Sequence, residues 1–132
     1  MEILLPKKIL CKLINLPKEY ELKDVEKNWL VAWHGTNYKV LESIAEIGLK
    51  PAGGKNKNGD EIKVCVSHIG RDKTVDNIPD WANGIFVSPS IFYSGYEAYA
   101  KEICLNNEQW RVLVEVRVKP DSYFDRESTC GN

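Results

Sequence analysis

The sequence has no large excess of either charge, and in particular it lacks the strong positive charge typical of proteins that bind nucleic acids electrostatically. Its 132 residues carry 18 basic and 19 acidic side chains, for a formal net charge of -1. Because no basic stripe follows the chain, bulk electrostatics gives no indication of nucleic-acid binding, and a negatively charged substrate would have to be held by local contacts. The length fits one domain with one core.

A long uninterrupted apolar run is also missing. The hydrophobic first residues, MEILLPKKILCKLINLPKEY, are broken by prolines and lysines at Pro6, Lys7, Lys8, Lys12 and Pro17. Such a segment is neither the apolar core of a signal peptide nor a membrane span. We therefore expect a soluble protein with no membrane partner.

The cysteines are few and far apart, at Cys11, Cys65, Cys104 and Cys130. This spacing does not fit a secreted disulfide scaffold and favours free thiols in a reducing compartment, so we expect an intracellular protein, cytoplasmic or nuclear. Cys65 and His68 have C-x-x-H spacing, but no second close pair completes the four ligands of a structural zinc site. We expect no metal.

Short apolar runs separated by polar segments predict a mixed fold. We expect strands at 9–16, 29–33, 62–67, 84–88 and 111–118; in the last, valines alternate with Glu115 and Arg117. The segment 51–60, PAGGKNKNGD, matches no phosphate-binding pattern and is interpreted as a flexible surface loop. No internal repeat or low-complexity segment is present.

Two helices are expected between these strands. Helical spacing begins after Asn37, with Thr36 or Asn37 as the N-cap and Gly48 as the C-terminal stop. A second helix is expected through PSIFYSGYEAYAKEI, carrying Tyr96, Tyr99 and Ile103.

The tripeptide His34-Gly35-Thr36 follows the predicted strand 29–33 and is the first candidate site. A glycine after a strand-end histidine lets a ligand reach the backbone N–H and C=O, which suits a planar carboxamide. The imidazole would contact a sugar hydroxyl. On spacing alone, a purely structural turn is the simpler interpretation.

Five blocks in one order change that weighting: WHGT, a helix ending in IGLKP, then GIFVS, YSGYEAYA and RVLVEVRVKPDSY. Together, from Trp29 to Tyr123, they resemble the catalytic domain of the poly(ADP-ribose) polymerase-like ADP-ribosyltransferases, most closely the divergent branch found in neuralized-like proteins. The resemblance implies an α+β fold with split antiparallel β-sheets and flanking helices. We expect a lead-in segment, 1–28, packed on an ADP-ribosyltransferase-like domain, 29–132.

NAD is the substrate that this resemblance implies, with no metal. His34, the residue carried over as catalytic, would contact the adenosine-side ribose, the Gly35 backbone would hold the nicotinamide carboxamide, and Thr36 would buttress them. We expect the domain to be a monomer whose acceptor, a protein or a nucleic acid, the sequence does not identify.

The same resemblance places three more residues at the NAD pocket. Ser94 would hydrogen-bond the carboxamide oxygen and Tyr99 would stack on nicotinamide, with Tyr96 as a second candidate for stacking. Phe86 stands where many relatives have tyrosine, which argues against polymer synthesis. We expect His34, Ser94 and Tyr99 to converge on one cleft.

The third, acidic motif of the family lies on a strand beyond VKPDSY, and only FDRESTCGN follows Tyr123. Glu127 lies too close to this end to belong to a paired strand, so we expect the domain to lack its C-terminal strands. Mono-ADP-ribosylation is therefore one hypothesis, and a catalytically inactive module that binds NAD or a protein partner is the other. Arg71 and Lys73 fit either a pyrophosphate contact or an ordinary charged loop.

Overall fold

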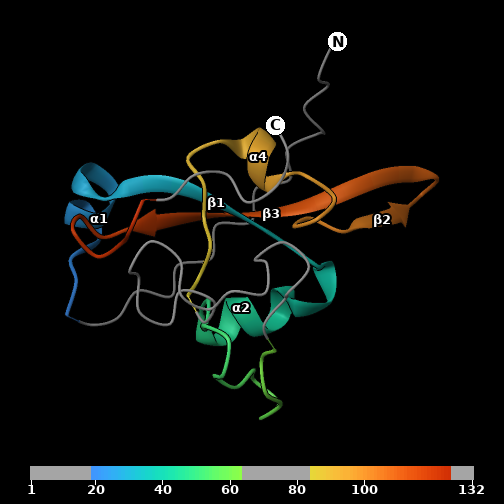
Figure 1. Cartoon of the computed structure of the whole chain (residues 1–132), viewed down its shortest axis with the longest axis horizontal. Coiled ribbons are helices and arrows are strands. Elements are labelled where there is room, and N and C mark those ends of the chain that lie inside the picture. The colour runs from blue at the N-terminus through green and yellow to red at the C-terminus, as the bar shows by residue number, and fades with distance from the viewer. Residues whose placement is uncertain (1–18, 64–83, 126–132) are drawn as a thin grey trace.

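A three-stranded antiparallel sheet organises residues 19–63 and 84–125, the part of the chain that the computed structural model describes (Figure 1). Its strands are β1 (Leu30–Thr36), β2 (Glu102–Leu105) and β3 (Glu108–Val118), in the order β1-β3-β2. The described residues are thus a small α+β protein, as expected. Within them there is one sheet, and the second sheet that the family resemblance implies is not among them.

The central strand β3 confirms the alternating pattern of its sequence. It pairs with β1 along its length, from Leu30 opposite Val118 to Thr36 opposite Val112. Since side chains alternate along a strand, Ala32 and His34 lie on one face and Trp33 and Gly35 on the other.

A tight hairpin joins β2 to β3, and the second helix predicted from the sequence is wrong at this point. Ile103 lies in β2 and not in a helix. Asn106 and Asn107, between the strands, have φ values of 52° and 63°. Two consecutive residues with positive φ make the two-residue hairpin turn whose twist matches that of the strands, and asparagine tolerates that conformation better than most residues.

The helical part of the predicted segment is a single turn, α4 (Ile91–Ser94). Ser90 caps it by accepting a hydrogen bond from the Tyr93 N–H at 3.2 Å. The predicted strand 84–88 is likewise reduced to one bridge, in which Ser88 pairs with Trp33 at the outer edge of β1. Figure 1 shows α4 on one side of the sheet.

The first predicted helix is present as η1 (Tyr38–Val40) followed by α2 (Leu41–Ile47). The Asn37 side chain accepts a hydrogen bond from the Lys39 N–H, and Gly48 ends α2 with a φ of 75°. Both predicted boundary residues are confirmed. In Figure 1, α2 lies across the sheet from α4.

A helix absent from the prediction, α1 (Leu22–Asn28), precedes β1. It contacts the far end of the sheet, where the Arg117 guanidinium donates to the Glu26 carbonyl oxygen at 3.1 Å. Beside it, the rings of Tyr20 and Trp29 meet edge to face at 5.0 Å, and Lys119 lies over the Tyr20 ring.

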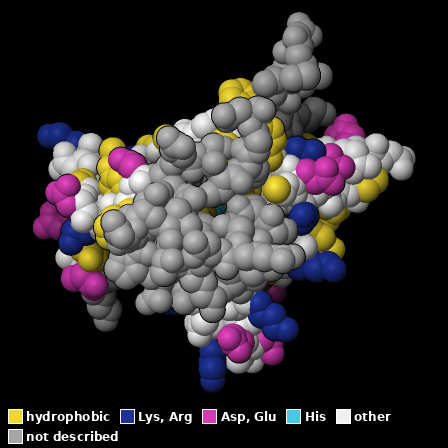
Figure 2. Space-filling model, viewed as in Figure 1, with side chains coloured by type: hydrophobic (Ala, Val, Ile, Leu, Met, Phe, Trp, Pro, Cys, Tyr) yellow, Lys and Arg dark blue, Asp and Glu magenta, His cyan; other side chains and the backbone are white. Residues whose placement is uncertain are grey.

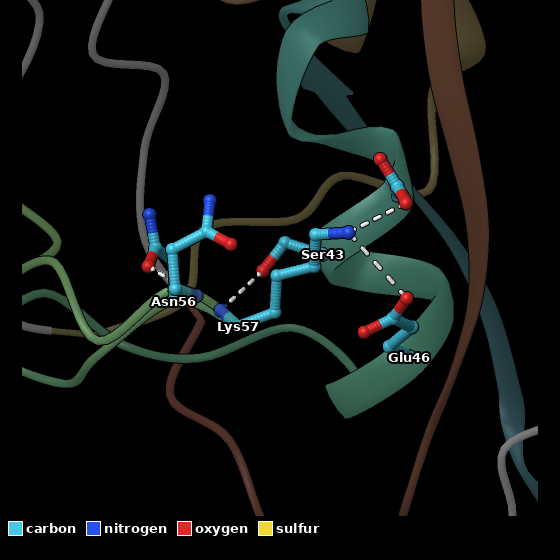
Figure 3. Close-up of polar contacts among 6 residues, drawn as sticks. Ser43, Glu46, Asn56 and Lys57 are labelled. Carbon is cyan, nitrogen blue, oxygen red and sulfur yellow. Dashed lines mark hydrogen bonds and ion pairs between the residues drawn. The ribbon is translucent and has the colours of Figure 1, made fainter.

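The loop after α2 was expected to be flexible, but it is closed by its own hydrogen bonds. Lys55 bridges Glu61, and the Asn56 side chain accepts from two backbone N–H groups within the loop. Lys57 then fixes the loop to α2: its N–H donates to the Ser43 hydroxyl at 3.0 Å (Figure 3).

The Lys57 ammonium adds ion pairs to α2 with Glu42 and, at 3.4 Å, with Glu46. The hydrogen bond that the Lys57 ammonium donates to the Glu42 carboxylate outweighs the opposing effect of desolvation and raises the pKa of Lys57 above its ordinary 10.5. The lysine therefore stays charged, and the loop stays anchored, at neutral pH.

The described part of the face drawn in Figure 2 carries basic and acidic side chains interspersed. No helix within residues 19–63 and 84–125 has the length and apolar character needed to cross a membrane.

Several predictions lie outside those residues: the strand 9–16, most of the strand 62–67, and the interpretations of Cys65, His68, Arg71, Lys73 and Glu127.

Candidate functional site

His34, Gly35 and Thr36 lie inside β1, so the predicted turn at these residues is wrong. They pair with Val114, Leu113 and Val112 of β3 without interruption. The strand continues beyond the apolar residues 29–33 because pairing with the long β3 forms the backbone hydrogen bonds irrespective of the side chains.

Gly35 is the residue on which the candidate site is built. A Cβ atom placed on it would overlap the Ser94 carbonyl oxygen and would lie 2.9 Å from the Tyr99 Cβ and 3.1 Å from the Ala100 nitrogen. Real Cβ atoms essentially never approach another atom as closely as the first two of these contacts, so only glycine fits here without a shift of the backbone. The segment from Ser94 to Ala100 therefore packs directly on the β1 backbone.

The peptide groups of Gly35 face the outer edge of the sheet. Trp33 exchanges both of its backbone hydrogen bonds with Ser88, at 2.8 and 3.0 Å, on the side away from β3. Since alternate residues of a strand direct their N–H and C=O to the same edge, those of Gly35 point to that edge as well. Among the described residues, no backbone hydrogen bond joins Gly35 to the segment 84–88.

His34 lies half-buried on the other face of β1, with its Nδ1 2.8 Å from the Phe86 carbonyl oxygen. A carbonyl only accepts hydrogen bonds, so Nδ1 carries a proton and donates it. In the neutral imidazole, Nε2 is then the acceptor, and the tautomer is fixed by this contact.

Ser94 is buried, with 3% of its surface exposed. Its hydroxyl donates to the Trp33 carbonyl oxygen at 2.8 Å, the same oxygen that accepts from the Ser88 N–H. This hydrogen bond ties α4 to β1 one residue before Gly35. It also uses the single proton of the hydroxyl, which keeps only acceptor capacity for a ligand.

Two tyrosines, Tyr96 and Tyr99, lie in the segment 94–100 that covers Gly35, and Tyr93 directly precedes it. Tyr99 is half-buried beside Gly35, and its hydroxyl lies 2.9 Å from that of Tyr93. Tyr96 is 47% exposed and touches Tyr93 edge to face, with ring centroids 5.9 Å apart. The Cβ of Tyr99 thus lies beside Gly35 in space.

The structure brings some of the predicted residues together and separates others. Ser94 and Tyr99 meet at Gly35, on the face of β1 that α4 covers, whereas His34 and the buried Thr36 lie on the opposite face. Phe86 contributes its carbonyl oxygen to His34 at the outer edge. The expected single cleft is therefore replaced by groups on both faces of β1.

Tyr93 is the residue that sequence analysis missed. Nothing in the spacing of YSGYEAY distinguishes its hydroxyl from those of the other tyrosines. Its contact with Tyr99 depends on the chain turning after α4, and that turn was predicted as helix.

Within residues 19–63 and 84–125, no three histidine, cysteine or carboxylate side chains group closely enough to hold a metal ion. Comparisons of the chain with protein-family models, with curated proteins and with solved structures found no match.

Proposed function

We propose that the outer edge of β1 beside Gly35 binds NAD, and that the chain is an ADP-ribosyltransferase that transfers a single ADP-ribose unit to an acceptor. The observation that carries the proposal is the environment of Gly35: its peptide groups point to the strand edge, and Tyr99 packs against it. That combination supports the contacts that the family resemblance implies at this residue.

A nicotinamide carboxamide complements the peptide groups of Gly35. Its oxygen would accept from the Gly35 N–H, and its NH2 group would donate to the Gly35 C=O, since a carboxamide has both functions in one plane. The Tyr99 Cβ is among the three atoms nearest to the Cβ position of Gly35, whereas Tyr96 is 47% exposed, which favours Tyr99 for stacking on the nicotinamide ring.

The orientation of His34 supports its assigned contact with a ribose. Because Nδ1 donates to Phe86, Nε2 of the neutral ring is left to accept a hydrogen bond from a hydroxyl. Ribose supplies such a donor. The position of His34 on the other face of β1 requires NAD to cross the strand edge, with nicotinamide on the Gly35 side.

The reaction that follows is a substitution at the anomeric carbon of the nicotinamide ribose. The bond from this carbon to the nicotinamide nitrogen breaks, and nicotinamide leaves with the electron pair. The acceptor's nucleophile forms the new bond at the same carbon and loses its proton. Positioning of the two reactants and stabilisation of the developing positive charge would supply most of the acceleration.

A second candidate is a catalytically inactive module that binds NAD or a protein partner. It is favoured by Ser94, whose only proton is used in the hydrogen bond to Trp33 and is not left for a carboxamide oxygen. It is also favoured by Phe86, which lacks the hydroxyl of the tyrosine found in many relatives.

Calorimetric titration of the chain with NAD, and of His34→Ala, tests the proposal. The variant should bind NAD about 2- to 12-fold more weakly, as expected for the loss of one hydrogen bond worth about 0.5 to 1.5 kcal/mol. Glu61→Gln, an exposed change on the loop after α2, is the matched control and should bind like the wild type. Unchanged affinity of His34→Ala with a large fall in melting temperature would show a structural histidine instead.

Release of nicotinamide over time separates the two candidates. The enzyme predicts release that depends on Tyr99, so that Tyr99→Ala abolishes it. Binding of NAD without release would support the inactive module, and no binding at all would refute both NAD hypotheses.

A further inference from the structure

The hydroxyl groups of Tyr93 and Tyr99 lie 2.9 Å apart, within hydrogen-bonding distance. The two rings are also in contact, with centroids 5.4 Å apart and planes inclined by 41°. Both side chains are half-buried. The two tyrosines thus meet both at their hydroxyl groups and through their tilted rings, and the proposed function gives Tyr93 no role.

Tyr93 is itself held firmly, because the single turn of α4 is anchored on both sides of it. The Tyr93 N–H donates to the Ser90 hydroxyl at 3.2 Å. The next residue, Ser94, donates to the Trp33 carbonyl oxygen at 2.8 Å. The Tyr93 ring is therefore held in a fixed position relative to the β1 backbone.

The contacts close a circuit around the candidate site. From Trp33 of β1 they pass through Ser94 to Tyr93, across the hydroxyl pair to Tyr99, and back to Gly35 of β1. Both ends of the circuit lie on one strand, two residues apart. A ring held at its Cβ end by Gly35 and at its hydroxyl end by Tyr93 has little freedom to rotate.

We propose that Tyr93 is a positioning residue that fixes the Tyr99 ring for stacking on the nicotinamide of NAD. The inference rests on the proposed function, since it concerns the same site. In this role Tyr93 acts on NAD binding through its contact with the Tyr99 hydroxyl and not as a ligand of NAD itself. Preorganising a stacking surface removes the cost of ordering that ring when the ligand binds.

The test is a double-mutant cycle on the two hydroxyls, using Tyr93→Phe, Tyr99→Phe and the double variant. Phenylalanine keeps each ring and removes only the oxygen. Each single variant should weaken NAD binding about 2- to 12-fold, as expected for one lost hydrogen bond. Because both remove the same bond, the double variant should be no weaker than the weaker single variant.

Two controls separate positioning from a general structural effect. Tyr123→Phe removes the hydroxyl of an exposed tyrosine that lies outside the candidate site, and it should bind NAD like the wild type. ADP-ribose lacks nicotinamide, so its affinity should be the same for Tyr93→Phe as for the wild type. Damage to the fold would lower the affinity for both ligands together.

Each result decides between the two proposals. If the wild type binds NAD but Tyr93→Phe binds it equally well, or if the two single effects add, the role of Tyr93 is refuted and the proposed function stands. An equal loss of ADP-ribose affinity would also refute the positioning role. If the wild type does not bind NAD, both proposals fail.

Discussion

Gly35→Ala is the most informative perturbation of the structure. The new Cβ would overlap the Ser94 carbonyl oxygen and crowd Tyr99 and Ala100, at 2.9 and 3.1 Å. All of the nearest atoms are backbone or the Cβ of Tyr99, so no flexible side-chain end can move away. The segment 94–100 must lift from β1 as a unit.

The cost has two parts. Overpacking of this kind costs about 1 to 3 kcal/mol, and weakening of the hydrogen bond from Ser94 to Trp33 adds about 0.5 to 1.5 kcal/mol. We expect the free energy of unfolding to fall by about 1.5 to 4.5 kcal/mol and the melting temperature by roughly 10 °C. Thermal and urea unfolding of the purified variant would measure both.

Gly95→Ala is the matched control, since Gly95 belongs to the segment 94–100 that packs on β1 and, like Gly35, does not have a positive φ. Its Cβ would come no closer than 3.1 Å to any of these neighbours, the nearest being the Ile91 carbonyl oxygen. We expect it to cost less than about 1 kcal/mol. If Gly35→Ala were no more destabilising than Gly95→Ala, the packing of residues 94–100 on β1 would be refuted.

Two further predictions concern the loop after α2 and the β2–β3 hairpin. Lys57→Met should speed amide exchange in residues 52–62, with Lys55→Met as the unaffected control. Because the pKa of Lys57 is raised in the folded state, the stabilisation that its charge gives to the loop is fully present below pH 10.5 and is lost as the pH rises through the higher folded value. If the wild-type loop lost its protection from exchange already near neutral pH, this role of Lys57 would be contradicted. Asn107→Ala should lower the free energy of unfolding by about 1 kcal/mol, seen as a lower urea midpoint, because alanine disfavours the φ of 63° at this position. Asn107→Gly should not lower it, because glycine adopts a positive φ readily. Equal midpoints for the two variants would contradict the turn geometry.

Local patterns predicted the elements that local physics determines. The alternating valines identified β3, and Asn37 and Gly48 marked the helical segment between them, because capping and periodicity involve only neighbouring residues. The helix expected through Tyr96 to Ile103 failed for the opposite reason. Pairing of residues 102–105 with β3 overrode their helical spacing, and the Asn106-Asn107 pair that signals the hairpin was overlooked.

Part of the membership of the candidate site was predictable, but its arrangement was not. Gly35, Ser94 and Tyr99 do meet, although Gly35 lies about 60 residues before the other two in sequence. Their arrangement could not be predicted, because it depends on β1 continuing through Thr36 and on Ser94 turning its hydroxyl to Trp33. Both follow from long-range pairing that a single sequence does not encode locally.

The central claim is that the Gly35 peptide groups bind a carboxamide, and comparison of NAD with its nicotinic acid analogue tests it most directly. In the analogue a carboxylate replaces the carboxamide, so it has no N–H to donate to the Gly35 carbonyl and would place a negative charge against that oxygen. Calorimetric titration of the unmodified chain should give an affinity for NAD at least about 5-fold higher than for the analogue, since a carbonyl left without its donor costs about 1 to 3 kcal/mol. Equal affinities, or binding of neither compound, would contradict the account.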